Sequence, residues 1–387
     1  MANFNQVSTI SISCPKRLAD ILEKEVIGQG FKPLSKRITG VDVEGSLNDC
    51  IRLNLFLRTA HRIHFLLAEK SIDTPEALYA WLSSVEWENY IDSRGYMSVT
   101  SRIDHPSIDN TQFANLKVKD AIVDRIRAKK GSRPDSGNDL NKTVVFLYWD
   151  QNIARVFLDT SGESLSRRGY RVENAKAPMQ ESLAAAILLS SRWKPGTHLI
   201  NPMCGSGTIA IEAALMATGA EAAPNRRNFG FMHILGFDRD VYKQLRVDAR
   251  KNRPKTLDFK IIATDNDPRA IEAAKKNTEV SGMADYIEFH NCDFSRTPIP
   301  DGDGVLVFNP PYGERIGEVK DLEPLYSDIG TFLKHECPGK TGYIFTGNLE
   351  LAKKIGLKPS SKTPFYNTTI DCRLFEFELF QGKAKHQ

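Results

Sequence analysis

The sequence predicts an α/β protein of more than one domain, in which a doubly wound parallel sheet in the C-terminal half follows smaller α+β modules. Three observations lead to this prediction. The chain has 387 residues, which is more than one hydrophobic core normally holds. A β-α-β order within the first 70 residues is typical of a ferredoxin-like module. From residue 178 onward strands and helices alternate, as they do in a doubly wound sheet.

The N-terminal part divides into two α+β stretches, residues 1–70 and residues 71–163. The first is expected to contain strands at 7–13 and 40–45, an amphipathic helix at 16–28, and a second helix that leads into an apolar strand by residue 69. The second is expected to contain helices at 74–85 and 115–130 and strands at 95–103, 143–150 and 153–160. Little more than Gln151 and Asn152 separates the last two strands, so we expect a hairpin there.

Residues 164–177 are interpreted as a linker, because they are rich in serine, glycine and charge and lack periodicity. The domain that follows, residues 178–387, should bind its ligand at the carboxyl ends of its strands. Residues 219–258 are rich in arginine, asparagine and proline and are interpreted as an insertion. Strands are expected at 198–201, 259–264, 287–293, 304–309 and 341–347, with a final pair around 372–380.

Composition narrows the function. The net charge of +4 permits a nucleic-acid partner without demanding one. The six cysteines include no C-x-x-C pair, so we expect neither a zinc site nor a disulfide framework, and we expect a cytoplasmic location. We expect no metal in this protein. The apolar runs are too short to cross a bilayer, and the N-terminus lacks the pattern of a signal peptide.

Two basic stretches are candidate RNA contacts. Residues 125–133 hold five bases and no acid, and residues 164–171 hold three bases beside Tyr170. For each stretch, a solvated surface and a phosphate-binding surface are comparably good interpretations. The candidate residues are Arg125, Arg127, Lys129, Lys130, Arg133, Arg167, Arg168 and Arg171.

The first expected strand of the C-terminal domain leads into the loop NPMCGSGTIAIEA, residues 201–213. Gly205 and Gly207 allow a sharp turn and a close approach of a ligand to the backbone, and Thr208 can open the following helix. The spacing G-x-G-x-x-A also occurs in dinucleotide sites, so a nicotinamide-dependent dehydrogenase is one interpretation of this loop.

An acidic residue after the next strand should accept both hydroxyls of a ribose. Asp238 and Asp265 compete for this role, and we favour Asp265 because KIIAT has the composition of a buried strand and an amphipathic helix follows. Asp265 also suits a helix N-cap, and the two roles can coexist. Asp293 follows a third strand, where it could accept an adenine amine, although a lone Asp at a strand end is often a turn residue.

The fourth loop reads NPPYGER, residues 309–315. Asn309 ends a buried strand, so we expect its amide to face the ligand cleft. Pro310 and Pro311 stiffen the backbone, and the Pro310 carbonyl is expected to lie beside the Asn309 side-chain carbonyl as a second acceptor. Tyr312 adds a flat stacking surface. Two acceptors and a ring suit a planar base that carries an exocyclic NH2 group.

Together these loops resemble class I S-adenosylmethionine-dependent methyltransferases that act on amino groups, whose fourth motif is (Asn/Asp)-Pro-Pro-(Tyr/Phe). Residues 110–126 and 159–170 are similar to the THUMP domain and linker of RlmL-type 23S ribosomal RNA guanine-N2-methyltransferases. APMQESLAAAIL and NPPYGERIG are similar to further motifs of that family, and nearly the whole chain aligns in order. The resemblance implies a ferredoxin-like module at 1–70, an RNA-binding THUMP domain at 71–163 and a Rossmann-like class I methyltransferase domain at 178–387.

The resemblance also implies an enzyme for rRNA processing that moves a methyl group from S-adenosylmethionine to the exocyclic amine of a guanine in 23S rRNA. Enzymes that modify guanine in tRNA are homologous to this family. Adenine and protein-glutamine methyltransferases share the amine-binding loop seen here at residues 309–312, which we call the amine clamp. The residues therefore leave these alternatives open. An intact Asn309 argues against an RNA-binding module with an inactive catalytic domain. We expect a single methyltransferase unit in this chain.

Residue roles follow from the same resemblance. Target-base and catalytic roles fall on Asn309, Pro310, Pro311 and Tyr312. Cofactor contacts fall on Gln180, Asn201, Pro202, Cys204, Gly205, Gly207, Thr208, Asp265, Asp293 and Asn309. One position departs from the family pattern: the first strand usually ends in Asp, whereas this chain has Asn201, which cannot pair with the ammonium group of the cofactor.

Overall fold

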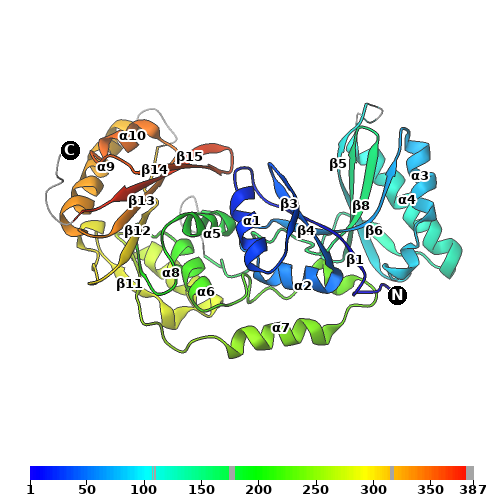
Figure 1. Cartoon of the computed structure of the whole chain (residues 1–387), viewed down its shortest axis with the longest axis horizontal. Helices are drawn as coiled ribbons and strands as arrows, with labels where there is room; N and C mark the ends of the chain where they lie inside the picture. The colour runs from blue at the N-terminus through cyan, green and yellow to red at the C-terminus, as the bar shows by residue number, and fades with distance from the viewer. Residues whose placement is uncertain (107, 109, 174–178, 314–317, 381–387) are drawn as a thin grey trace. The chain divides into compact units, whose positions relative to one another are not determined.

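A computed structural model describes residues 1–106, 108, 110–173, 179–313 and 318–380 (Figure 1). The chain divides into two units, which are described separately. The first comprises Met1–Cys14, Leu22–Arg167 and Arg226–Asp248, and the second comprises Pro15–Ile21, Arg168–Asn225 and Ala249–Gln387. Within the described residues, no helix has the length and apolar content needed to cross a membrane.

The first unit is built on one eight-stranded sheet with the order β2-β3-β1-β4-β8-β7-β5-β6. Its first half contains β1 (Val7–Ser13), most of α1 (Ala19–Gly28), β2 (Pro33–Arg37), β3 (Gly40–Ser46), α2 (Leu47–Phe56) and β4 (Arg62–Ser71). Its second half contains α3 (Pro75–Ser84), η1 (Trp87–Asn89), β5 (Tyr96–Asp104), α4 (Thr111–Lys130), β6 (Asp135–Gly137), β7 (Thr143–Asp150) and β8 (Ile153–Asp159).

Antiparallel pairing of β4 with β8 joins the two halves, with His64 opposite Asp159 and Phe65 opposite Leu158. The sequence predicts two separate modules, but the boundary that it places after residue 70 falls inside β4. The predicted hairpin of β7 and β8 is present. The short strands β2 and β6 were not expected, because neither carries an apolar alternation: all of β6 is exposed, and β2 is exposed after its first residue.

Helices cover one face of this sheet. On β7, Val145, Leu147 and Trp149 are buried in a core that also contains Leu82 of α3 and Ile122 of α4. The intervening Phe146 and Tyr148 are partly exposed on the other face. This is the alternation expected of strands that pack a single face against helices. Gly131 ends α4 in the left-handed conformation with φ 72°, which an L side chain adopts with strain.

Part of the predicted insertion belongs to the first unit. Residues 226–248 contain η2 (Gly230–His233) and most of α7 (Arg239–Lys251). The Phe231 amide donates to the Thr160 carbonyl at 2.9 Å. The Arg226 guanidinium donates to the carbonyls of Ser161, Glu163 and Ser164, with distances of 2.7 to 3.0 Å. These bonds hold Arg226 and Phe231 of this segment against the residues at the end of β8.

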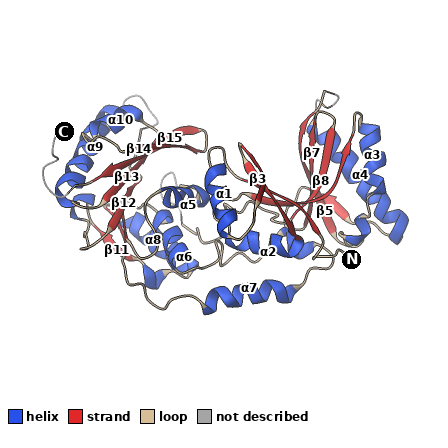
Figure 2. Ribbon diagram, viewed as in Figure 1, coloured by secondary structure: helices blue, strands red, loops and turns tan. Residues whose placement is uncertain are grey.

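The second unit is a doubly wound sheet, as the sequence predicts, and its strand order is β11-β10-β9-β12-β13-β15-β14 (Figure 2). Strands β9 to β13 are parallel, and β15 is antiparallel to β13 and β14. Helices α5, α6 and α8 lie on one side of it and α9 and α10 on the other. The strands are β9 (His198–Pro202), β10 (Ile261–Asp265), β11 (Glu288–Asn291), β12 (Gly304–Phe308), β13 (Thr341–Thr346), β14 (Ser361–Asn367) and β15 (Ile370–Glu378). The helices are α5 (Glu181–Ser190), α6 (Thr208–Ala217), α8 (Pro268–Ser281), η3 (Ala284–Tyr286), η4 (Phe294–Arg296), α9 (Glu318–Glu336) and α10 (Leu349–Lys354).

The strand order reverses between β9 and β12. Beyond β9 the chain adds β10 and β11 on one side, and beyond β12 it adds β13 on the other. Loops at the carboxyl ends of strands diverge at such a point, which leaves room for a ligand. The loops that the sequence singles out after β9 and β12 therefore lie side by side.

Candidate active site

Asn201 lies near the end of β9 and is fully buried. Its amide Nδ2 donates to the Val307 carbonyl of β12 at 2.8 Å, while its Oδ1 has no hydrogen-bond partner among the described residues. An ionised aspartate has no proton to donate to that carbonyl. The bond to Val307 thus gives a physical reason for asparagine at a position where the family pattern has Asp.

The glycine loop follows β9 and begins α6. Gly205 and Gly207 have φ values of 56° and 80°, the left-handed region that favours glycine. Apart from Gly205 itself and its chain neighbours, no heavy atom of the described residues lies within 4 Å of the place where a Gly205 Cβ would stand, whereas a Gly207 Cβ would lie 3.0 Å from the Ala274 Cβ. Gly205 therefore borders open space, and Gly207 allows α6 to pack on α8.

Asp265 is the last residue of β10, the strand that pairs with β9. Its Oδ2 accepts from the Gly205 amide at 2.9 Å, and its Oδ1 accepts from the Asp267 amide at 3.0 Å. The N-cap of α8 is Asp267, so Asp265 does not perform the capping role that the sequence also allowed. Asp238 precedes α7 in the first unit, is exposed and accepts from the Asp240 amide.

Cys204 lies between the glycine loop and Asp265. Its amide donates to the Thr264 carbonyl at 2.9 Å, which ties the loop to β10. Burial raises the pKa of the Cys204 thiol well above its usual value, and the Asp265 carboxylate adds to the rise. The thiol therefore stays protonated, which keeps it from acting as a nucleophile next to the site.

Asp293 follows β11 and caps η4. One carboxylate oxygen accepts both from the Ser295 amide, at 3.0 Å, and from the Ser295 hydroxyl, at 2.6 Å. The other oxygen, Oδ2, makes no hydrogen bond among the described residues. A turn role is therefore present at Asp293, and a second acceptor is left for a ligand.

The NPPY loop follows β12. Asn309 is half-buried, and its Oδ1 is shielded from solvent without a hydrogen-bond partner among the described residues. A buried carbonyl oxygen of this kind costs about 1–3 kcal/mol unless a ligand supplies a donor. The Glu314 to Gly317 part of the motif lies outside the described residues.

Three side chains from other elements brace this loop. The Tyr326 hydroxyl of α9 donates to the Pro311 carbonyl at 3.2 Å. Asn348 Nδ2 donates to the Tyr312 carbonyl at 3.3 Å, and Asn367 Nδ2 donates to the Tyr312 hydroxyl oxygen at 2.7 Å. The sequence pattern indicates the rigid prolines but not this support, because the three residues lie far from the motif in sequence.

The linker arginines do not all occupy the place that the sequence predicts. Arg168 has a side chain only 1% exposed and lies 3.6 Å from Glu212, so its assignment as an RNA contact is wrong. Arg171 pairs with Glu181 at 3.1 Å and donates to the Met179 carbonyl and the Thr208 hydroxyl. It thereby connects the chain before α5 to the first turn of α6, which makes it a positioning residue of the glycine loop. Arg167 is exposed.

Gln180 is the N-cap residue of α5, is exposed and makes no side-chain capping bond. The basic residues of the stretch 125–133 also differ in their surroundings. Arg125 makes two hydrogen bonds to Glu88, at 2.7 and 3.1 Å, and so stabilises the fold. Arg127, Lys129, Lys130 and Arg133 are exposed. No group of three or more metal-ligating side chains gathers anywhere in the described ranges.

Comparison with known families matches the chain in three consecutive segments. Residues 9–64 match the RlmL ferredoxin-like domain, residues 73–159 the THUMP domain, and residues 168–376 the RMKL-like methyltransferase domain. The first two segments together supply most of the eight-stranded sheet of the first unit, and the third supplies the site described above.

Among curated proteins, the ribosomal RNA large subunit methyltransferase K/L of Syntrophotalea carbinolica is 37% identical over 381 residues, which cover 96% of this chain and 53% of that protein. The protein of the same name from Pseudomonas aeruginosa is 36% identical over 386 residues, again 96% and 53%. The chain spans about half the length of the curated relatives it matches.

Among solved structures, SMU.472, whose crystal structure is a complex with SAH, aligns with TM-score 0.87 and 27% identity over 98% of this chain and 100% of that one. A protein of Listeria monocytogenes, named as a predicted N6-adenine-specific DNA methylase, aligns with TM-score 0.87 and 28% identity over 97% of both chains. TrmN from Thermus thermophilus shares the fold, with TM-score 0.70 and 18% identity over 96% of this chain and 100% of that one.

Proposed function

Since the chain belongs to the RMKL-like methyltransferase domain family, we propose that it transfers a methyl group from S-adenosylmethionine to the exocyclic amine of a guanine in 23S rRNA. The observation that carries this proposal is the unpartnered, shielded oxygen of Asn309 at the switch point of the sheet. Relatives named as large-subunit rRNA methyltransferases favour ribosomal RNA as the substrate.

The site fits S-adenosylmethionine. Open space at Gly205 allows the methionine part to approach the backbone, and the unpartnered Oδ1 of Asn201 in the preceding strand is a further acceptor. Asp265 keeps lone pairs for ribose hydroxyls besides the two amides that it binds. The unused oxygen of Asp293 suits an adenine amine. The methyl group of the cofactor is activated by its positive sulfonium, so the protein mainly has to align an amine with it.

Asn309 and the Pro310 carbonyl would hold that amine. The lone pair of a base amine is delocalised into the ring, which makes the nitrogen a poor nucleophile. Two fixed acceptors favour a tetrahedral nitrogen as positive charge develops on it. Tyr312 would stack on the base, and alignment of this kind supplies roughly 7–11 kcal/mol in favourable cases. The braces from Tyr326, Asn348 and Asn367 keep the acceptors in place without the target bound.

A target base has to leave its stack to reach this loop, at a cost of a few kcal/mol. The THUMP segment offers binding energy to offset that cost.

We place the enzyme in the cytoplasm, since all six cysteines are free thiols. We propose no metal in the reaction, because the sulfonium already provides the leaving group.

The test supplies the purified chain with S-adenosylmethionine and either unmodified 23S rRNA or unmodified tRNA, followed by nuclease digestion and mass spectrometry. We expect N2-methylguanosine in the 23S rRNA digest. N6-methyladenosine would instead support the adenine alternative, to which the name of the Listeria protein points. Methylation confined to tRNA would contradict the choice of ribosomal RNA.

The exposed end of α4 is proposed as an RNA contact of this enzyme. Replacing Arg127, Lys129 and Lys130 together with glutamine should weaken binding of 23S rRNA and flatten its salt dependence, because each lost phosphate contact lowers the slope of log K against log salt by about 0.9 for a duplex. Filter binding at two salt concentrations measures both quantities, with cofactor affinity as the control. A slope equal to that of the wild type would make these residues an ordinary solvated surface.

A further inference from the structure

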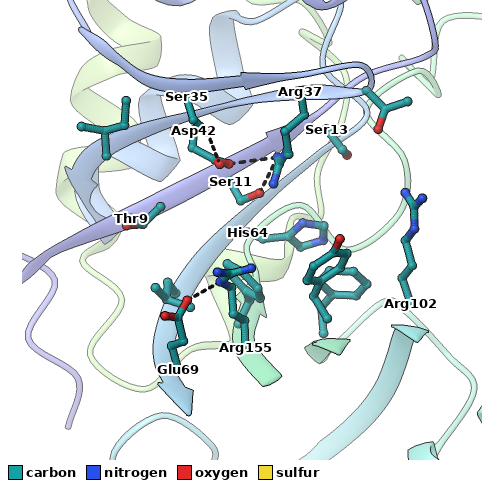
Figure 3. A pocket seen from close by; sticks show the side chains of 16 residues that line it. Thr9, Ser11, Ser13, Ser35, Arg37, Asp42, His64, Glu69, Arg102 and Arg155 are labelled. Atoms are coloured by element: carbon teal, nitrogen blue, oxygen red, sulfur yellow. Dashed lines mark hydrogen bonds and ion pairs between the residues drawn. The ribbon is translucent and has the colours of Figure 1, made fainter. Parts of the chain in front are cut away.

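The first unit has a groove that the proposed methyl-transfer site does not use (Figure 3). It has a volume of about 510 Å³ and lies on the face of the eight-stranded sheet that α3 and α4 leave uncovered. Thr9, Ser11 and His64 line it from β1 and β4, and Phe146 and Arg155 line it from β7 and β8. We call it the sheet-face groove.

The groove is composite. Its lining comes both from residues that match the ferredoxin-like domain and from residues that match the THUMP domain. Pairing of β4 with β8 places the two sets in one surface. Neither domain alone would form it, so the groove is a product of the continuous sheet.

Aromatic rings lie on this face where polar side chains are usual. Phe146 and Tyr148 are partly exposed, although they belong to a strand whose other face is in the core. His64 stacks on Phe146 with ring centroids 4.4 Å apart and an angle of 15° between the planes. Rings exposed on an open sheet provide surfaces on which unpaired bases stack.

Arginines flank the rings. In the sheet register Tyr148 lies opposite Arg102 of β5 on one side and Arg155 of β8 on the other. Burial and the nearby Asp150 raise the pKa of Tyr148, whereas Arg102 and Arg37 act to lower it, in keeping with guanidinium groups near the ring. Arg102 and Arg155 thus place a positive charge on each side of the Tyr148 ring. A single strand of RNA has a phosphate on each side of a base, so its charges would face these two arginines when the base stacks on the ring.

These arginines can exchange their present partners for phosphates. Arg37 pairs with Asp42 at 2.9 Å and donates to Ser11, and Arg155 pairs with Glu69. Both arginine side chains are at least 35% exposed, and ion pairs of such exposure contribute little to stability. No ion pair engages Arg102 within the described part of the chain.

We propose that the sheet-face groove binds an unpaired segment of the substrate RNA, with bases stacked on Phe146 and Tyr148 and phosphates held by Arg37, Arg102 and Arg155. This inference rests on the proposed function for the identity of the substrate as RNA. A duplex presents its base faces to neighbouring bases and not to the groove, so the groove should prefer single strands.

Fluorescence anisotropy with the full chain tests this, using a labelled ten-nucleotide RNA of mixed sequence and a blunt duplex of the same length. The variant Tyr148→Leu should bind the single strand about 5- to 150-fold more weakly, the range for loss of one stacked base, while Tyr148→Phe keeps the wild-type affinity. Arg102→Gln should lower the salt slope for the single strand by about 0.7. Arg52→Gln is the matched control, since Arg52 is an exposed arginine on α2, away from the groove lining.

Three results would overturn the inference. The first is wild-type affinity for the single strand in both Tyr148→Leu and Arg102→Gln, and the second is a loss of affinity in Arg52→Gln as large as that in Arg102→Gln. The third is displacement of the RNA by poly-glutamate of equal charge at equal concentration. Thermal unfolding followed by circular dichroism shows whether each variant is folded. The proposed function fails separately: a chain that binds the single strand through the groove but leaves 23S rRNA unmethylated would contradict the methyl-transfer proposal and leave the groove assignment intact.

Discussion

Replacing Asn309 with alanine is expected to lower methyl-transfer turnover about 10²–10³-fold, by analogy with the removal of one group that stabilises developing charge. Affinity for the cofactor should change no more than a few-fold, because the lost oxygen is the acceptor that we propose for the target amine. Isothermal titration calorimetry with S-adenosylhomocysteine and a methyl-transfer assay on 23S rRNA measure the two quantities.

Asn309→Asp serves as the matched control. It keeps an acceptor oxygen at the same position, and the motif resembled by this loop allows either residue, so this variant should retain measurable turnover. If alanine weakened cofactor binding as much as it lowered turnover, Asn309 would belong to the cofactor site and the amine clamp would have to be reassigned.

Replacing Asp265 with alanine should have the opposite pattern and weaken cofactor binding by roughly 1–3 kcal/mol, or about 5- to 150-fold in Kd. The variant loses the acceptor proposed for the ribose hydroxyls and also releases the Gly205 amide that Asp265 holds at 2.9 Å. Calorimetry with S-adenosylmethionine measures the change.

Asp238→Ala is the control for this second experiment, because Asp238 is the acidic residue that competed with Asp265 in the sequence. Its carboxylate is exposed beside α7 and belongs to the first unit, so its loss should leave the affinity unaltered. An affinity loss in Asp238→Ala, with none in Asp265→Ala, would place the ribose elsewhere.

Local pattern was sufficient for most elements and for the positions of the site loops. Apolar runs such as GVLVF identify buried strands, and the period of apolar residues identifies helices such as α4. Because parallel strands place their carboxyl ends on one edge, the sequence alone predicts that the polar residues at the ends of β9, β10, β11 and β12 lie along one edge of the sheet.

Contacts between distant segments were decided only by the tertiary structure. Arg168 and Arg171 look alike in sequence, yet one is buried beside Glu212 and the other clamps the start of α6. The N-cap of α8 is Asp267 rather than Asp265, a difference of two residues that depends on where β10 ends. Element boundaries and ion-pair partners depend on packing, which a local pattern does not encode.

The sequence by itself determined the class of the C-terminal fold, the glycine loop and the NPPY loop, because strand and helix periods and proline stiffness are local properties of the chain. The tertiary structure alone decided that β4 pairs with β8, that Asn201 donates to Val307, and that Tyr326, Asn348 and Asn367 brace the clamp. Each of these joins residues far apart in sequence, and such a pairing is selected by the free energy of the whole packed unit, which no short stretch of residues specifies.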